Sequence, residues 1–142
     1  MASSSHILIV TSPYYKQISD MLVLGAVGEL KKNAATYDVM ETTGALEIAQ
    51  VIKYAKGQYL AYVALGCVIR GETSHYDIVS QESARALTHL SLEHDMCIGN
   101  GILTVDNIEQ ALVRADHRQK NKGGDAAKAA LSLMALKGKF KM

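Results

Sequence analysis

The segment Arg70-Gly71-Glu72-Thr73-Ser74-His75 contains the residue types that anion binding and proton transfer need. It follows a long apolar run and precedes a helical pattern, so its backbone N–H groups lie at a helix start, where anions bind. Gly71 allows close approach of a ligand, and Thr73 adds a hydroxyl. His75 lies on the same turn, and an imidazole exchanges protons near neutral pH. The segment therefore predicts an anion site beside a proton-transfer group.

The same segment is also compatible with a plain strand-to-helix turn. In that interpretation Thr73 or Ser74 caps the helix, His75 is exposed and Arg70 forms a structural ion pair. Capping turns are common, so spacing alone does not decide between the two interpretations.

Alternating strand and helix patterns must position this segment. Apolar runs without helical spacing predict strands at residues 6–10, 37–40, 59–69 and 96–103. Helical spacing predicts helices over 17–33, 45–56, 78–94 and 124–140, and a further helix that Asp106 caps and that includes Ala111 and Ala115. Strands alternating with helices predict a parallel sheet covered on both faces. We therefore expect an α/β fold, a flavodoxin-like three-layer αβα sandwich with a four-stranded parallel sheet.

This topology indicates where a ligand would bind. In open parallel sheets, ligands lie beyond the carboxyl ends of the strands. Polar residues and glycines gather at four such places, residues 11–16, 42–47, 70–77 and 99–106. The first predicted helix also has a small face with Gly25, Ala26 and Gly28, which permits close packing. That packing is either internal or between subunits, and we favour the internal one.

Length, charge and cysteine content limit the class of protein. The 142 residues fit one domain, 1–142, with residues 1–5 as a loose N-terminal tail. A net charge of +1 does not favour a nucleic-acid partner. The sequence has neither a membrane-spanning apolar run nor a signal-peptide pattern. Cys67 and Cys97 fall in apolar runs, so we expect buried, reduced thiols rather than a disulfide. These features predict a cytoplasmic protein.

Metal and redox cofactors are not predicted. His89 and His94 are the closest histidines in sequence, but five residues along a helix place them roughly 140° apart around its axis. The sequence contains no P-loop, no GxGxxG after the first strand and no catalytic-serine elbow. We therefore expect no metal site and no cofactor.

Four ordered stretches resemble the lumazine synthase family. They are GCVIRGETSHYD at 66–77, GALEI at 44–48, NGILTVDNIEQA at 100–111 and RADHRQKNKGGDAA at 114–127. The resemblance covers about residues 6–140. It implies condensation of 5-amino-6-(D-ribitylamino)uracil with 3,4-dihydroxy-2-butanone 4-phosphate to 6,7-dimethyl-8-ribityllumazine, phosphate and water. It also implies a homopentamer, or multiples of it, in which adjacent subunits share each active site.

The resemblance assigns the phosphate and proton-transfer roles. His75 would transfer protons during imine formation and phosphate elimination. The phosphate would be held by Gly71, Glu72 and Thr73, mostly through main-chain N–H groups. Arg114 would bind the same phosphate from a neighbouring subunit, although its helical spacing also permits a plain solvent-facing arginine. Lys122 matches the lysine of the family's NKG stretch, and a solvated loop charge is the alternative.

The remaining roles concern the pyrimidine substrate. Tyr14 would stack on its ring, with Tyr15 as a rival for that role and a plain core or surface tyrosine as the alternative. Main-chain groups of Val68 and Ile69 would meet the pyrimidine edge. The ribityl chain and ring would be lined by Ala45, Leu46 and Glu47, with Glu47 accepting hydrogen bonds from hydroxyls.

Asn100 departs from the family pattern. Many members have an aromatic residue there, where a neighbouring subunit closes the pyrimidine pocket. Asn100 can donate or accept a hydrogen bond to substrate but cannot stack. This departure keeps open a non-catalytic lumazine- or riboflavin-binding paralogue. An FMN-binding electron carrier is a third hypothesis, but TSPYY at 11–15 lacks the glycine-bearing hydroxyl loop that such proteins use.

Overall fold

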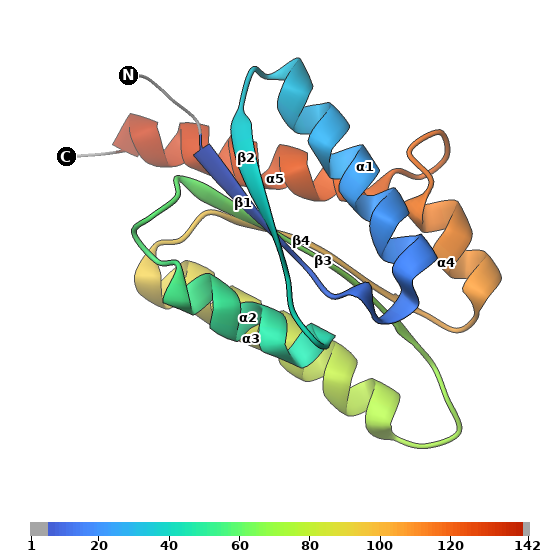
Figure 1. Ribbon diagram of the computed structural model, residues 1–142. Helices are drawn as coiled ribbons and strands as arrows, with labels where there is room; N and C mark the ends of the chain where they lie inside the picture. Colours follow the sequence, from blue (N-terminus) through green and yellow to red (C-terminus); the bar gives the residue numbers. More distant parts are fainter. Residues whose placement is uncertain (1–5, 141–142) are drawn as a thin grey trace.

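The computed structural model describes residues 6–140, in which strands and helices alternate (Figure 1). The strands are β1 (His6–Thr11), β2 (Thr36–Glu41), β3 (Ala61–Ile69) and β4 (Ile98–Val105). The helices are α1 (Lys16–Lys32), α2 (Ala45–Tyr54), α3 (His75–His94), α4 (Ile108–Ala115) and α5 (Lys122–Phe140), with a short 3-10 helix η1 (Pro13–Tyr15) before α1. The tail predicted at residues 1–5 lies outside the described residues. Among residues 6–140, no helix is both long and apolar enough to cross a membrane.

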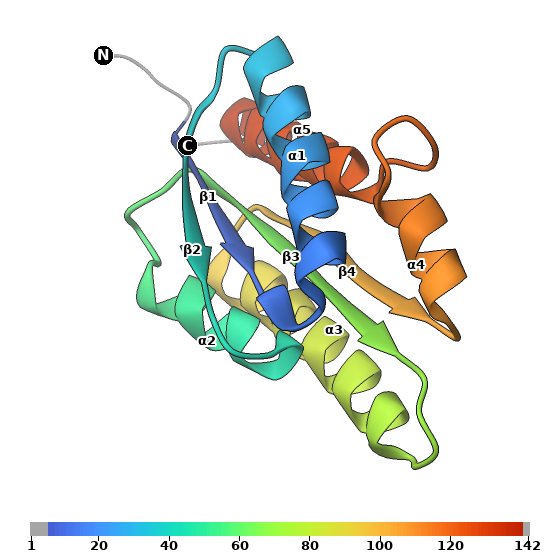
Figure 2. The same ribbon diagram turned by 45° about the vertical axis from the view of Figure 1, so that its right-hand side comes forward.

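The sheet has the strand order β2-β1-β3-β4, and all neighbouring strands are parallel. Helices α1, α4 and α5 cover one face, and α2 and α3 cover the other (Figures 1 and 2). This arrangement confirms the predicted three-layer αβα sandwich. The chain leaves β1 toward α1 on one face and leaves the adjacent β3 toward α3 on the opposite face. The two loops therefore diverge and open a crevice at the carboxyl end of the sheet.

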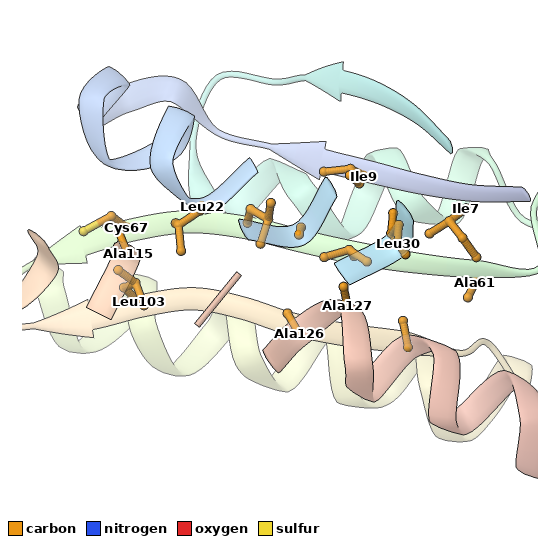
Figure 3. Close-up of a cluster of buried hydrophobic side chains, with 14 of the residues drawn as sticks. Ile7, Ile9, Leu22, Leu30, Ala61, Cys67, Leu103, Ala115, Ala126 and Ala127 are labelled. Carbon is orange, nitrogen blue, oxygen red and sulfur yellow. The ribbon is translucent and has the colours of Figure 1, made fainter. Parts of the chain in front are cut away.

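Two apolar clusters, one on each face of the sheet, form the core. Side chains alternate along β1, so Ile7 and Ile9 join one cluster while Leu8 and Val10 join the other. Figure 3 shows the first cluster, in which α1 contributes Leu22 and Leu30, and α5 contributes Ala126 and Ala127. Because both faces are covered, the central strands are continuous apolar runs, which is the pattern that the sequence shows.

Glycines bring α5 into direct contact with β4 and α1. A Cβ on Gly99 of β4 would coincide with the carbonyl group of Ala126 in α5. A Cβ on Gly25 of α1 would collide with the Asn121 side chain just before α5. Internal packing, which we favoured for the small face of α1, is thus confirmed for Gly25 and for the buried Ala26. An added Cβ on Gly28 would meet nothing within 4 Å, so that glycine has no such role.

Several boundaries differ from the predicted ones. The predicted cap Asp106 is wrong, because Asn107 is the N-cap of α4 and its Oδ1 accepts a hydrogen bond from the Gln110 N–H at 2.9 Å. Asp and Asn are similarly good caps, so sequence alone could not select between these neighbours. Helix α3 begins at His75 rather than at the predicted Ile78, because its first turn is polar and lacks the apolar spacing used for prediction.

Candidate active site

A cavity of about 360 Å³ lies in the crevice beyond the carboxyl ends of β1 and β3. It is bordered by η1, the start of α2, the end of β3 and the first turn of α3. Of the residues predicted for the site, those that line it are Tyr14, Ala45, Leu46, Glu47, Val68, Ile69 and His75. Three sequence segments far apart in the chain therefore meet where the topology predicted a ligand.

Hydrogen bonds connect the loops after β1 and β2 with each other and with the Glu47 side chain. The Ser12 hydroxyl donates to the Thr43 carbonyl at 3.1 Å, and the Thr43 hydroxyl donates to Glu47 Oε1 at 3.0 Å. Gly44, the extended N-cap of α2, leaves room for this carboxylate, since its Cβ would lie 2.9 Å from Glu47 Oε1. Glu47 is thus held in the first turn of α2, where the helix dipole favours a negative charge.

The two neighbouring tyrosines differ in exposure. Tyr14 is 75% exposed, whereas Tyr15 packs against the core cluster below α1. Their rings meet edge to face with centroids 5.0 Å apart. Burial raises the pKa of the Tyr15 hydroxyl, with smaller contributions from Tyr14 and Cys67. Tyr14 is therefore the tyrosine whose ring is available to a ligand.

His75 is the first residue of α3, and the loop before it is exposed. The His75 N–H donates to the Thr73 hydroxyl at 3.2 Å, so Thr73 satisfies part of the helix start. Gly71, Glu72 and Thr73 lie beside the cavity rather than among the residues that line it. An added Cβ on Gly71 would meet nothing within 4 Å, so packing within the chain does not require a glycine there.

Asn100, Arg114 and Lys122 lie together, but in a different cavity. This second cavity, of about 330 Å³, lies against the outer strand β4 between α4 and α5. Asn100 Oδ1 accepts from the Ile102 N–H at 2.9 Å, and Arg114 Nη1 donates to the Gln110 carbonyl at 3.2 Å. Lys122, predicted in a loop, begins α5 and lies 3.7 Å from the Asp125 carboxylate. The structure therefore does not bring these side chains to the His75 cavity of the same chain.

Other residues that line the first cavity were not predicted for the site. They are Ser12, Gly44, Cys67 and Val79, together with Tyr15, which was considered only as a rival to Tyr14. The apolar spacing of Cys67 and Val79 indicates core, and both are largely buried. Only the polar character of residues 11–16 pointed toward Ser12.

Both cysteines are free and buried, which confirms the prediction of reduced thiols. Burial raises the pKa of Cys67 to about 11. The thiol in the cavity wall is therefore protonated at neutral pH and is a poor nucleophile. Within residues 6–140, no three His, Cys, Asp or Glu side chains are grouped closely enough to hold a metal ion.

Comparison with known proteins decides the family. The sequence model of the 6,7-dimethyl-8-ribityllumazine synthase family matches residues 4–138. The chain belongs to this family. The resemblance inferred from four short stretches is thereby confirmed over nearly the whole chain, together with the fold that it implied.

Curated relatives are similar over almost their full length. The 6,7-dimethyl-8-ribityllumazine synthase of Bartonella tribocorum is 52% identical to this chain, over 99% of this chain and 95% of the relative. The proteins of the same name from Zymomonas mobilis and Sphingopyxis alaskensis are 52% and 49% identical and cover 94% and 96% of this chain. These alignments cover 96% and 97% of the two relatives.

Proposed function

We propose that this protein condenses 5-amino-6-(D-ribitylamino)uracil with 3,4-dihydroxy-2-butanone 4-phosphate to form 6,7-dimethyl-8-ribityllumazine, phosphate and water. The observation that supports this most strongly is the single cavity that unites Tyr14, Glu47 and His75, in a chain about half identical to synthases of that name. The reaction needs two reactants held together and a departing phosphate stabilised, and these are tasks for binding groups and one proton-transfer group.

The pyrimidine substrate would occupy the tyrosine side of the cavity. The exposed ring of Tyr14 stacks on the pyrimidine, and main-chain groups of Val68 and Ile69 meet its polar edge. The ribityl chain lies along the segment Ala45, Leu46 and Glu47, where the Glu47 carboxylate accepts from hydroxyls. Glu47 is already held by Thr43, so its orientation is set before the substrate arrives.

The butanone phosphate would bind at the start of α3. Backbone N–H groups of Gly71, Glu72 and Thr73 and the positive end of the helix dipole bind its phosphate. His75, at the edge of the same cavity, moves protons as the amine attacks the ketone and as phosphate leaves. Ring closure with loss of water then completes the product. No metal or redox cofactor takes part in this scheme.

The second cavity would complete the site of a neighbouring subunit. Arg114, Lys122 and Asn100 are apart from His75 within one chain, so they reach a His75 cavity only from another copy. We therefore propose a homopentamer, or multiples of it, of single-domain chains over 1–142, in which Arg114 binds the substrate phosphate. We place this assembly in the cytoplasm, where free thiols stay reduced. Its ligands are these small molecules, with neither nucleic acid nor membrane as a partner.

Incubation of the protein with both substrates is expected to produce lumazine fluorescence and one equivalent of phosphate. Mixtures that omit either substrate are expected to stay dark. Tight binding of lumazine or riboflavin without turnover would instead support the non-catalytic paralogue. A yellow protein with a reversibly reducible flavin would support the electron carrier.

Arg114→Gln is expected to raise the KM for the butanone phosphate by about 10- to 100-fold, because a charge-assisted hydrogen bond to phosphate is lost. Steady-state fluorescence kinetics at saturating pyrimidine substrate measure this change. Arg118→Gln is the matched control, since Arg118 pairs with Asp116 outside both cavities and its loss should leave KM unchanged. A monomer in light scattering that retains full activity would contradict the shared site.

A further inference from the structure

Arg70 connects three parts of the chain around the loop that precedes His75. Its backbone N–H donates to the Val105 carbonyl at 2.9 Å, and its Nε donates to Asp106 Oδ1 at 3.0 Å. Its Nη1 lies 3.8 Å from Asp77 Oδ1. Its guanidinium carbon lies 4.3 Å from the centroid of the Tyr76 ring, within cation–π range. One side chain therefore contacts the β4–α4 connection and the first turn of α3.

These contacts join the two ends of one loop. The loop 71–74 begins directly after Arg70 and ends directly before His75, the first residue of α3. Tyr76 and Asp77, at the far end, are the residues that the Arg70 guanidinium contacts. Asp106 is itself held, because its N–H donates to Gln110 Oε1 at 2.7 Å at the start of α4. The loop is thus closed by a guanidinium that pairs with the carboxylate of Asp106, a residue whose backbone is held at the start of α4.

We infer that Arg70 is a positioning residue, which holds the loop 71–74 and His75 in place through Asp106, Tyr76 and Asp77, and that it does not bind the substrate phosphate itself. This inference rests on the proposed function, which assigns phosphate binding to the loop 71–74. Two carboxylates already oppose the Arg70 charge, so the guanidinium offers little net attraction to another anion. An exposed ion pair contributes little to global stability, so its effect is expected to be local.

The alternative, in which Arg70 is a direct phosphate ligand, predicts the opposite effect for Asp106. Removal of the Asp106 charge would free the guanidinium for the phosphate and would leave binding unchanged or tighter. If Arg70 acts through Asp106, removal of either partner releases the loop and weakens phosphate binding to a similar extent. The sign of the Asp106 effect therefore separates the two roles.

Arg70→Gln and Asp106→Asn are each expected to raise the KM for the butanone phosphate about tenfold. The effect should stay below the roughly hundredfold loss that a 1 Å misplacement of a reacting group can cause, because the loop is loosened rather than displaced. The KM for the pyrimidine substrate should change less than about twofold, because the Tyr14 side of the cavity is untouched. The double variant should resemble either single variant, since both remove one shared interaction. Asp106→Glu keeps the carboxylate and should restore most of the binding.

Arg85→Gln is the matched control, because it breaks the exposed Arg85–Glu82 pair within the same helix α3, away from the loop. Its kinetic constants should equal those of the wild type. The positioning role would be overturned if Arg70→Gln raised the KM for the butanone phosphate while Asp106→Asn left it unchanged or lowered it. Wild-type kinetics in both variants would do the same.

Amide hydrogen exchange tests the inference without turnover. Exchange of the hydrogen-bonded amides at the two ends of the loop, Arg70 and Asp77, should be about tenfold faster in Arg70→Gln and Asp106→Asn than in the wild type or in Arg85→Gln, because local opening sets the rate of a protected amide. Unchanged exchange in both variants would refute the role of Arg70 even in an active enzyme. A wild-type protein without turnover would refute the proposed function, and faster exchange in the variants would still support the contacts of Arg70.

Discussion

Gly99→Ala is expected to prevent stable folding. A Cβ at this position would coincide with the Ala126 carbonyl and lie 3.2 Å from the Ala130 N, so it meets the backbone of α5 rather than a flexible side chain. Helix α5 cannot simply move outward, because Gly123 of the same helix is packed equally closely against the Leu22 carbonyl of α1. We expect a loss of more than about 4 kcal/mol, a large part of the roughly 5–15 kcal/mol that stabilises a domain.

Circular dichroism and urea unfolding measure this loss, and Gly28→Ala is the control. An added Cβ on Gly28, in α1, meets nothing within 4 Å. Because alanine is favoured over glycine inside a helix by about 0.5–1 kcal/mol, Gly28→Ala should be as stable as the wild type or slightly more stable. Equal unfolding midpoints for Gly99→Ala and the wild type would show that α5 and β4 are not packed as described.

His75→Ala is expected to lower kcat by about a hundred- to a thousandfold, within the range for the loss of a general acid–base group. The side chain is exposed at the start of α3, so the variant should keep the wild-type melting temperature. Its KM for the butanone phosphate should change little, because main-chain groups hold the phosphate in the proposed scheme. Fluorescence at saturating concentrations of both substrates measures kcat.

His89→Ala is the matched control for His75→Ala. His89 lies on the same helix but outside both candidate cavities, so its removal should leave kcat unchanged. A wild-type kcat in His75→Ala would remove the imidazole from the proposed mechanism. The start of α3 would then have only a binding role.

The layers of the fold were predictable because the periodicity of the sequence is strong. Buried strands such as β1 and β3 are continuous apolar runs, and each is followed by a helix. Exact ends were less predictable where tertiary contacts decide them. Helix α4 is capped by Asn107, while the neighbouring Asp106 pairs with Arg70, a residue 36 positions earlier in the sequence. Periodicity contains no information on such a pair.

The candidate site was predictable only in part. Spacing near His75 left a turn and an anion site open, and the local contacts are those expected of the turn, since Thr73 accepts from the helix start and Arg70 forms an ion pair. The convergence of Tyr14 and Glu47 on the same cavity is what favours the site, and it depends on the order of strands. Arg114 is apart from His75 because its cavity lies against the outer strand β4. No local sequence pattern specifies that β4 takes the outer position in the sheet.

The ends of the described chain lie where the parallel strands begin, opposite to the cavity. The ring of His6, the first residue of β1, stacks on Tyr59 with centroids 5.0 Å apart, and Phe140 at the end of α5 borders a groove with Tyr59 and Leu60. The cavity lies where the strands end. A tag or a fused cargo protein joined directly before His6 or after Phe140 would therefore start from the pole of the molecule opposite to the cavity.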